Sequence, residues 1–234
     1  MEIIVDLFNQ HSGNVDELKR MALSAYLNGA DVAKIQILNS KRIWGDDSRK
    51  YLEMTYDEVK DFYDFCNSHS IEPWATVFDE ESLEWIIDLN TKRFKIASVT
   101  AAKDKKLCEK ILSYNKETII SLGMYNEEFP FGFDSNIKYL YCVSEYPTHL
   151  YNDKIRKMPK TFDEKGYYGY SDHAMGIVPA LQSYLNGSQL LEKHFTFNNF
   201  NQRETEKANL GAFTPDSLRL FKNLVNEFKN EINS

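Results

Sequence analysis

Two lysines stand inside short apolar stretches of the sequence, where a charged side chain is uncommon. Lys34 lies within Val-Ala-Lys-Ile-Gln-Ile, and Lys95 lies within Phe-Lys-Ile. A buried lysine is costly unless an opposite charge pairs with it. If both lysines point into one interior, we expect an anion between them, either a phosphate or a carboxylate. The alternatives are two independent structural salt bridges, or long side chains that reach the rim of the fold.

Two histidines, His173 and His194, end two consecutive stretches that read as strands. Adjacent strand ends lie about 5 Å apart, close enough for two imidazoles to share a divalent ion. Imidazoles together with water and carboxylate oxygens suit Mn²⁺, Co²⁺ or Zn²⁺ better than Ca²⁺. The sequence therefore predicts a divalent metal at His173 and His194, against the alternative of two ordinary rim residues.

Hydroxyl and carboxylate groups follow the other predicted strands. Three serines end predicted strands: Ser98, Ser121 and Ser171. Each alone is an ordinary strand-end residue, but together, beside two lysines, they would donate hydrogen bonds to phosphate oxygens and form a hydroxyl cradle. Candidate acid–base or orienting groups are Asp6, Glu145 and Glu192. Further polar residues at the strand ends are Gln36, Thr76, Ser144 and Tyr146. The sequence contains no Gly-x-Ser-x-Gly elbow, P-loop or dinucleotide-binding glycine motif.

Eight short apolar stretches alternate with amphipathic segments along the chain. The predicted strands are 3–8, 31–38, 72–78, 94–98, 118–123, 137–143, 167–171 and 188–195, and the predicted helices are 14–30, 55–69, 81–89, 103–113, 176–186 and 214–229. Such alternation implies parallel strands joined by right-handed crossovers. Eight strands predict an α/β fold, a closed (β/α)8 TIM barrel with its chemistry at the carboxyl ends of the strands.

The segment between the fifth and sixth predicted strands is an exception to this pattern. Residues 124–136 contain a proline and a glycine and show little helical periodicity. We therefore expect the connection between strands 5 and 6 to be abridged. No linker or repeat interrupts residues 1–234, which predicts a single barrel domain.

The composition is typical of a soluble globular protein. The 234 residues include 28 Lys and Arg against 35 Asp and Glu, a net charge of −7, and 42% are hydrophobic. The acidic balance argues against a nucleic-acid partner, and no apolar run approaches the ~18 residues of a membrane span. The three cysteines are widely spaced and the first residues lack a secretion signal. We expect a cytoplasmic protein with a small-molecule substrate and no membrane partner.

Three longer motifs resemble the sialic acid synthase family, the phosphoenolpyruvate-dependent synthases of nonulosonic acids. They are Ser-Glu-Tyr-Pro-Thr within 139–152, Gly-Tyr-Ser-Asp-His within 166–176 and Leu-Glu-Lys-His-Phe-Thr within 189–198. Weaker matches lie at 11–13, 29–36, 75–82, 93–98 and 120–124. The resemblance extends over the whole chain. It implies a barrel that condenses phosphoenolpyruvate with an open-chain, N-acylated amino sugar, releasing phosphate and forming a 3-deoxy-2-ulosonic acid.

The resemblance also implies roles for individual residues. Family positions that hold phosphoenolpyruvate match Lys34, Thr76, Lys95, Ser98, Ser121 and Ser171, and positions that face the sugar match Gln36 and Tyr146. His173 and His194 match the metal ligands, with Mn²⁺ the usual ion. Asp6 stands where the family has glutamate, and it would position or deprotonate a water. We expect catalysis from Asp6, Lys34, Lys95 and His173, and substrate binding from Ser144 as well.

The departures from the family pattern fall on the sugar side or the periphery. The sequence covers the barrel but not the family's C-terminal antifreeze-like domain, which supplies an arginine to a partner's site. Thr100 stands where the family has glutamate. The usual Gly-Pro-Asp is absent from 198–213, which offers Arg203, Glu204 and Glu206 instead. We therefore expect an altered acceptor, and either a homo-oligomer or a separate partner chain that completes the site.

Two other functions remain open at this point. One is a non-catalytic or partner-dependent paralogue that binds a sugar or an anion in a surface-polysaccharide pathway. The other is a different barrel chemistry, such as an aldolase that forms a Schiff base through Lys34 or Lys95. Metal binding at the two histidines would distinguish the synthase from the first alternative, and borohydride trapping would reveal the second.

Overall fold

Eight parallel strands pair in sequence order and close into a barrel. The structure is a computed structural model that describes residues 1–8, 10–125, 129–200 and 210–232. The strands are β1 (Glu2–Asp6), β2 (Val32–Ile37), β3 (Glu72–Val77), β4 (Phe94–Ile96), β5 (Thr118–Ser121), β6 (Ile137–Cys142), β7 (Tyr167–Asp172) and β8 (Leu190–His194). Each corresponds to one predicted strand. The prediction of a (β/α)8 barrel is confirmed.

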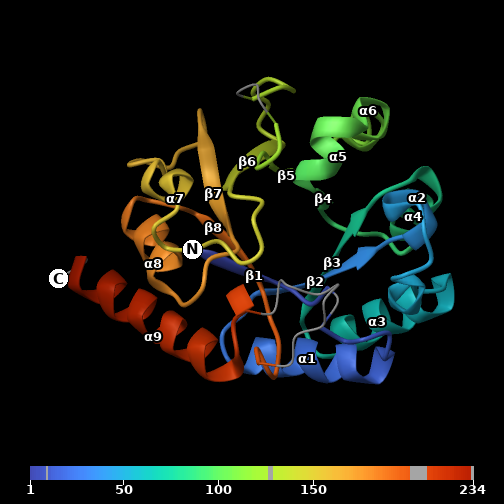
Figure 1. Cartoon of the computed structure of the whole chain (residues 1–234), viewed down its shortest axis with the longest axis horizontal. Helices are drawn as coiled ribbons and strands as arrows, with labels where there is room; N and C mark the ends of the chain where they lie inside the picture. Colours follow the sequence, from blue (N-terminus) through green and yellow to red (C-terminus); the bar gives the residue numbers. More distant parts are fainter. Residues whose placement is uncertain (9, 126–128, 201–209, 233–234) are drawn as a thin grey trace.

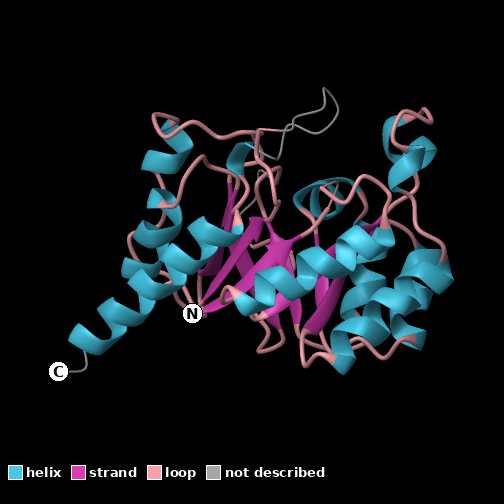
Figure 2. Cartoon of the chain, turned by 90° about the horizontal axis from the view of Figure 1, so that it is seen from below, coloured by secondary structure: helices cyan, strands magenta, loops and turns pink. Residues whose placement is uncertain are grey.

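In the described parts of the chain, six helices of eight or more residues surround the strands (Figures 1 and 2). They are α1 (Val15–Leu27), α3 (Tyr56–Ser68), α4 (Glu80–Asp88), α6 (Lys105–Leu112), α8 (Val178–Leu185) and α9 (Pro215–Ile232), and all six were predicted. Shorter turns of helix were not predicted: α2 (Ser40–Trp44), η1 (Lys50–Leu52), α5 (Ser98–Lys103) and α7 (Asp153–Arg156). Within the described residues, no helix combines the length and hydropathy needed to cross a membrane.

Local sequence signals set where the long helices begin. Asn14 caps α1, since its side chain accepts a hydrogen bond from the backbone N–H of Glu17. Thr55 and Glu58 form a complete capping box at the start of α3, as the sequence predicts. Because these caps fix the helix entries, the apolar stripes of both helices face the strands and pack into the main core.

The segment that joins β5 to β6 contributes aromatic residues that pack beside β6 and β7. No helix forms among the described residues of this segment, 124–125 and 129–136, so the expectation of an abridged connection is confirmed. Phe129 packs against Tyr139 and Tyr167 with ring centroids 5.1 Å apart in both pairs, and Phe133 lies 4.8 Å from Phe129. These rings cover strand surface that a helix covers elsewhere in the barrel.

The barrel interior is apolar at the amino ends of the strands. A small cluster fills it: Ile4, Val32, Trp74, Ile119, Leu140 and Leu190. On β7 the inward position is Gly169, where a Cβ would lie 2.3 Å from the carbonyl oxygen of Leu190. The close approach of two strands therefore requires glycine there.

Arg93, just before β4, ties several strands together at the amino end. Its guanidinium forms ion pairs with Glu2 at 2.5 Å, Glu72 at 2.9 Å and Glu117 at 3.3 Å. It also stacks 4.3 Å from the centroid of the Trp74 ring. One arginine thus links the starts of β1, β3, β4 and β5.

Candidate active site

Strand alternation brings the predicted polar residues to one end of the barrel. Side chains two residues apart on a strand share a face, so Asp6 follows Ile4 and Lys34 follows Val32 on the inner side. Lys34 pairs with Asp6 across β1 and β2, and Thr76 pairs with Lys95 across β3 and β4. The apolar layer at the amino end is therefore overlaid by a polar layer at the carboxyl end.

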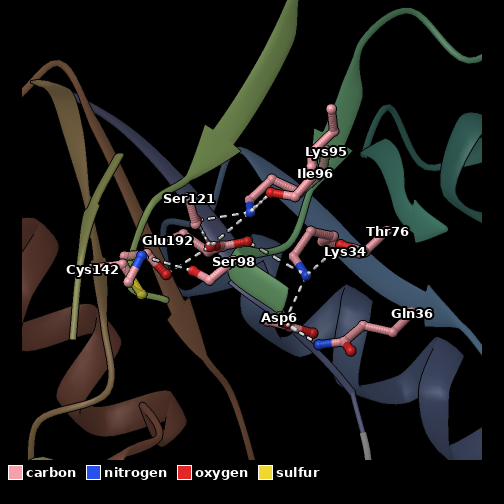
Figure 3. Close-up of polar contacts among 12 residues, drawn as sticks. Asp6, Lys34, Gln36, Thr76, Lys95, Ile96, Ser98, Ser121, Cys142 and Glu192 are labelled. Atoms are coloured by element: carbon pink, nitrogen blue, oxygen red, sulfur yellow. Dashed lines mark hydrogen bonds and ion pairs between the residues drawn. The ribbon is translucent and has the colours of Figure 1, made fainter. Parts of the chain in front are cut away.

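These polar residues line a cavity of about 610 Å³. Every residue predicted to bind substrate, metal or water lines it: Asp6, Lys34, Gln36, Thr76, Lys95, Ser98, Ser121, Ser144, Tyr146, Ser171, His173 and His194. Glu192 lines it as well. Figure 3 shows the side chains of its inner part converging from the strand ends. The structure thus brings the whole predicted set together.

The two buried lysines share one carboxylate. The Lys34 ammonium lies 2.6 Å from an Asp6 oxygen and 3.4 Å from Glu192 Oε1, and it donates to Thr76 Oγ1 at 3.2 Å. The Lys95 ammonium lies 3.5 Å from Glu192 Oε2 and donates to Ser121 Oγ at 2.9 Å. A carboxylate of the protein itself, Glu192, lies between the two lysines (Figure 3). The ion pairs of the two lysines are linked rather than independent, because both lysines contact this one side chain. A bound anion between the lysines stays a prediction.

Charge pairing in this cluster keeps its carboxylates ionised. Burial alone would raise the pKa of Asp6, but Lys34 outweighs burial and holds that pKa well below its usual range. Burial opposes ionisation of Glu192 too, and Lys95 and Lys34 still lower its pKa. Burial would lower the pKa of Lys34, but Asp6 and Glu192 raise it. Two negative groups therefore face two lysines in the cavity.

Lys95 differs from Lys34 in its electrostatics. Burial lowers the pKa of the Lys95 ammonium, the Glu192 carboxylate opposes this only in part, and the charge of Lys34 lowers it further. Lys34 has two carboxylates within 4 Å, whereas Lys95 has only the more distant Glu192 among the described residues. Lys95 is the lysine that gains most from an added anion.

The predicted hydroxyl cradle surrounds the lysine pair. Ser171 donates to Glu192 Oε2 at 2.8 Å, and Ser98 Oγ accepts from the backbone N–H of Gly123 at 3.0 Å. Gln36 donates from its side-chain amide to Asp6 at 2.8 Å. The cavity floor thus combines the two ammonium groups and these hydroxyls with the carboxylates of Asp6 and Glu192.

The donor set of the two histidines fits a divalent metal. The imidazole rings of His173 and His194 have centroids 5.6 Å apart, and both line the cavity. His173 Nδ1 bonds the backbone oxygen of Val143 at 2.9 Å, which fixes the ring and leaves Nε2 without a protein hydrogen bond among the described residues. His194 Nδ1 is buried without a hydrogen-bond partner in the same part of the chain. The described residues hold no group of three or more His, Cys, Asp or Glu suited to a metal, so water or substrate would complete the ligands.

A buried ion pair stands behind the histidines. The Lys193 ammonium lies 2.6 Å from a carboxylate oxygen of Asp172 and donates to the backbone oxygen of Ala174 at 2.7 Å. Both charged side chains are buried, on the outer faces of β7 and β8. Because His173 follows Asp172 and His194 follows Lys193, the pair fixes the backbone that carries both imidazoles.

Several polar residues considered from the sequence lie elsewhere. Glu145 does not line the cavity; its carboxylate pairs with Lys154 at 3.3 Å. Thr100 is buried in α5 and does not line the cavity either. The residues of 201–209, with Arg203, Glu204 and Glu206, lie outside the described residues.

Sequence reasoning missed part of the cavity wall. The missed residues are Phe8, Ile43, Trp44, Arg49, Phe78, Ala97, Val99, Met124 and Cys142. Cys142 Sγ lies 3.9 Å from His173 Nδ1. Strand alternation could have placed Cys142 inside the barrel, two residues after the inward Leu140. The loop residues give no comparable signal, because their positions depend on how the loops fold back.

A family comparison agrees with this geometry. The family model described as the NeuB family matches residues 21–232. The chain belongs to the NeuB family.

Relatives of this NeuB-family chain carry synthase names. The N-acetylneuraminate-9-phosphate synthase of Mus musculus is 27% identical over 222 residues, which cover 83% of this chain and 61% of that protein. The N,N'-diacetyllegionaminic acid synthase of Legionella pneumophila is 28% identical over 228 residues, with 83% and 63% covered. This chain therefore spans about three fifths of the length of these two relatives.

The solved structures agree on the barrel. The N-acetylneuraminic acid (sialic acid) synthetase of Leptospira borgpetersenii superposes with a TM-score of 0.81 at 22% identity, covering 99% of this chain and 85% of that one. At this level of identity the likeness supports the fold of the NeuB-family barrel.

Two buried histidines should make the NeuB-family barrel sensitive to acid. Burial lowers the pKa of His11 to about 4 and that of His194 to about 4. A histidine that stays neutral in the folded state does not lower the free energy of unfolding while the pH is above its unfolded pKa of ~6.5. As the pH falls from ~6.5 towards 4, protonation of this histidine in the unfolded state lowers the free energy of unfolding. We expect about 3 kcal/mol of lost stability per histidine over that range.

The variant His11→Asn tests this expectation, because the amide oxygen can replace His11 Nδ1 as acceptor for the backbone N–H of Gly13. Urea unfolding at pH 7 and pH 4, with EDTA present, measures the difference in stability from the wild type. That difference should shift by about 3 kcal/mol in favour of the variant at the lower pH. The exposed His69 provides the control His69→Asn. An unchanged difference for His11→Asn would contradict the expectation.

Proposed function

We propose that this NeuB-family chain condenses phosphoenolpyruvate with an open-chain aldose, releasing phosphate and forming a 3-deoxy-2-ulosonic acid. The acceptor we favour is an N-acylated amino sugar. The observation that carries the proposal is the pair of buried lysines around Glu192, ringed by hydroxyls. The names of the relatives, which include pseudaminic acid synthase of Campylobacter jejuni at 26% identity, point to the same class of product.

The donor would bind at the lysine pair. Lys34 and Lys95 supply two ammonium groups for the phosphate and carboxylate of phosphoenolpyruvate. Ser98, Ser121 and Ser171, with Thr76, supply hydroxyl donors around them. Such a site would hold the donor rigidly, so that its C3 faces the aldehyde of an acceptor bound above it.

A divalent ion, for which we propose Mn²⁺, would be held by His173 and His194. When bound, it would supply a Lewis acid next to the aldehyde oxygen of the acceptor. His194, with its pKa of about 4, is neutral at pH 7 and so offers a lone pair at that pH. Tyr146 packs against His173 with ring centroids 4.3 Å apart, which restricts the orientation of this imidazole.

The reaction then divides among the residues of the chain. C3 of phosphoenolpyruvate attacks the aldehyde carbon, water adds to C2, and phosphate leaves through cleavage of its C–O bond. Asp6 is ionised and held by Lys34 and Gln36, so its free lone pairs can position that water. A carboxylate with a lowered pKa is a weak base, and positioning is therefore its main role.

The cysteines and the exposed aromatic side chains indicate where the protein acts and what covers its surface. The three cysteines are free and buried, which suits a reducing cytoplasm. Aromatic side chains are exposed on the segments that follow two of the strands: Tyr146, after β6, is 43% exposed, and Phe197, after β8, is 41% exposed. We propose that a second copy or a separate chain covers these segments.

Phosphate release tests the proposed function. Phosphoenolpyruvate with Mn²⁺ is offered to a panel of aldoses: N-acetylmannosamine, diacetamido-trideoxyhexoses, arabinose 5-phosphate and plain hexoses. We expect one class of aldose to release phosphate and form a product heavier than the aldose by the elements of pyruvic acid, detected by mass spectrometry. Lys95→Met should abolish the release, whereas Lys110→Met, on the outer helix α6, should not. Silence across the panel with phosphoenolpyruvate bound would overturn the proposal.

A further inference from the structure

One wall of the cavity is built by the segment between β2 and α3. Ile43, Trp44 and Arg49 from this segment line the cavity together with Phe8 and Phe78. Trp44 is 37% exposed, whereas Lys34 and Lys95 are 2% and 3% exposed. The segment therefore forms the outer part of the cavity, above the lysine pair.

The β2–α3 segment holds Arg49 in place. The Arg49 guanidinium stacks 4.3 Å from the centroid of the Trp44 ring. Its backbone N–H donates to Ser40 Oγ at 3.1 Å, and the fully buried Ser40 in turn donates to the backbone oxygen of Asp46 at 2.8 Å. Stacking fixes the plane of the guanidinium, and none of the described residues hydrogen-bonds its N–H edges. The ordering entropy lost in a ligand contact is therefore small.

Arg49 differs from the deeper cations in its charge balance. Lys34 and Lys95 each lie within 4 Å of at least one of the buried carboxylates of Asp6 and Glu192. Among the described residues, Arg49 has no carboxylate within ion-pair distance. Asp46 interacts with its charge but is exposed and accepts a hydrogen bond from the backbone N–H of Ser48. The cavity mouth thus carries a preorganised positive charge that no carboxylate of the described residues pairs with at ion-pair distance.

From this we infer that Arg49, stacked on Trp44, binds an anionic group of the acceptor, a phosphate or a carboxylate at the end remote from the aldehyde. This inference rests on the proposed function and specifies its acceptor. The donor's own anionic groups have the buried lysines and hydroxyls below. Arg49 lies on the more exposed outer wall, where the far end of a sugar would extend. A planar guanidinium with free edges matches a phosphate or a carboxylate with two hydrogen bonds.

Matched acceptors test the inference. N-acetylmannosamine is compared with its 6-phosphate and with N-acetylmannosaminuronic acid, and arabinose with arabinose 5-phosphate. The test variant is Arg49→Met, which keeps an apolar stem on Trp44 and removes the charge. The control is Arg42→Met, on α2 but outside the cavity lining, where Arg42 makes only long contacts of 3.8 Å and 4.0 Å to acidic side chains.

We expect Arg49→Met to raise KM for the anionic acceptors about 10- to 100-fold. KM for phosphoenolpyruvate and for the uncharged acceptors should stay within about 2-fold of the wild type, and Arg42→Met should change none of them. Comparison of the 6-phosphate with the uronic acid shows whether Arg49 binds a phosphate or a carboxylate of the acceptor. A rise in KM for phosphoenolpyruvate instead, or no preference of the wild type for anionic acceptors, would overturn the inference.

Measurements of sugar binding test the role of Arg49 independently of the proposed reaction. If no acceptor releases phosphate, the proposed function fails, and calorimetry with the same sugars still tests Arg49. Tighter binding of the phosphorylated sugar by the wild type than by Arg49→Met would support the anion site without the reaction. Equal binding by the two proteins would overturn it.

Discussion

Replacing Lys34 with methionine will lower kcat/KM about 10²- to 10³-fold and cost about 3–5 kcal/mol of stability. The catalytic loss follows from the proposed role of Lys34, because the donor would lose one of the two buried ammonium groups. The stability loss follows because Asp6 and Glu192, both buried, lose the charge that lies 2.6 Å and 3.4 Å from their oxygens. Phosphate release and urea unfolding measure the two effects separately.

A second substitution separates the two roles of Lys34. Asp6→Asn in the Lys34→Met background removes one unpaired buried charge, so most of the lost stability should return. Binding of phosphoenolpyruvate, measured by calorimetry, should not return. If the double variant recovered both stability and donor binding, Lys34 would be a structural ion-pair partner and the anion-site reading would be wrong.

Replacing His194 with glutamine should remove Mn²⁺ binding and lower the metal-dependent rate about 10³-fold. The amide keeps a polar group in the cavity but is a poor metal ligand. Mn²⁺ binding, followed by electron paramagnetic resonance, gives a readout independent of turnover. His69→Gln, on an exposed residue at the end of α3, is the control.

Chelation gives a second test of the histidine pair. EDTA should stop phosphate release by the wild type, and added Mn²⁺ should restore it. Full activity in EDTA, or unchanged Mn²⁺ binding by His194→Gln, would contradict the assignment of the metal to His173 and His194.

The sequence predicts the inner polar layer because strand alternation is simple. In Leu-Leu-Glu-Lys-His, alternation sends Glu192 and His194 to the inner face and Lys193 to the outer face, as the structure has them. The apolar settings of Lys34 and Lys95 likewise indicate that both lysines are buried, and they are. The face and the burial of these residues depend on their neighbours along one strand, so both can be predicted from the sequence alone.

The outer wall could not be predicted in the same way. The short helix α2 (Ser40–Trp44) has too few residues for a helical period to emerge. Arg49 enters the cavity because its loop folds back on the buried Ser40, a contact across nine residues. The contact of Glu192 with both lysines could not be predicted either. It depends on the closure of the barrel, which brings β8 beside β1.

The ion pairs of Arg93 affect which parts of this barrel can change their sequence. Glu2, Glu72 and Glu117 bind it at the strand starts, at the end opposite the cavity. The strand order and register near that end are therefore anchored by groups that no substrate touches. Loops at the other rim, such as the one that carries Arg49, can exchange residues while the strands stay aligned. If Arg49 binds the acceptor as proposed, such exchanges would change the acceptor.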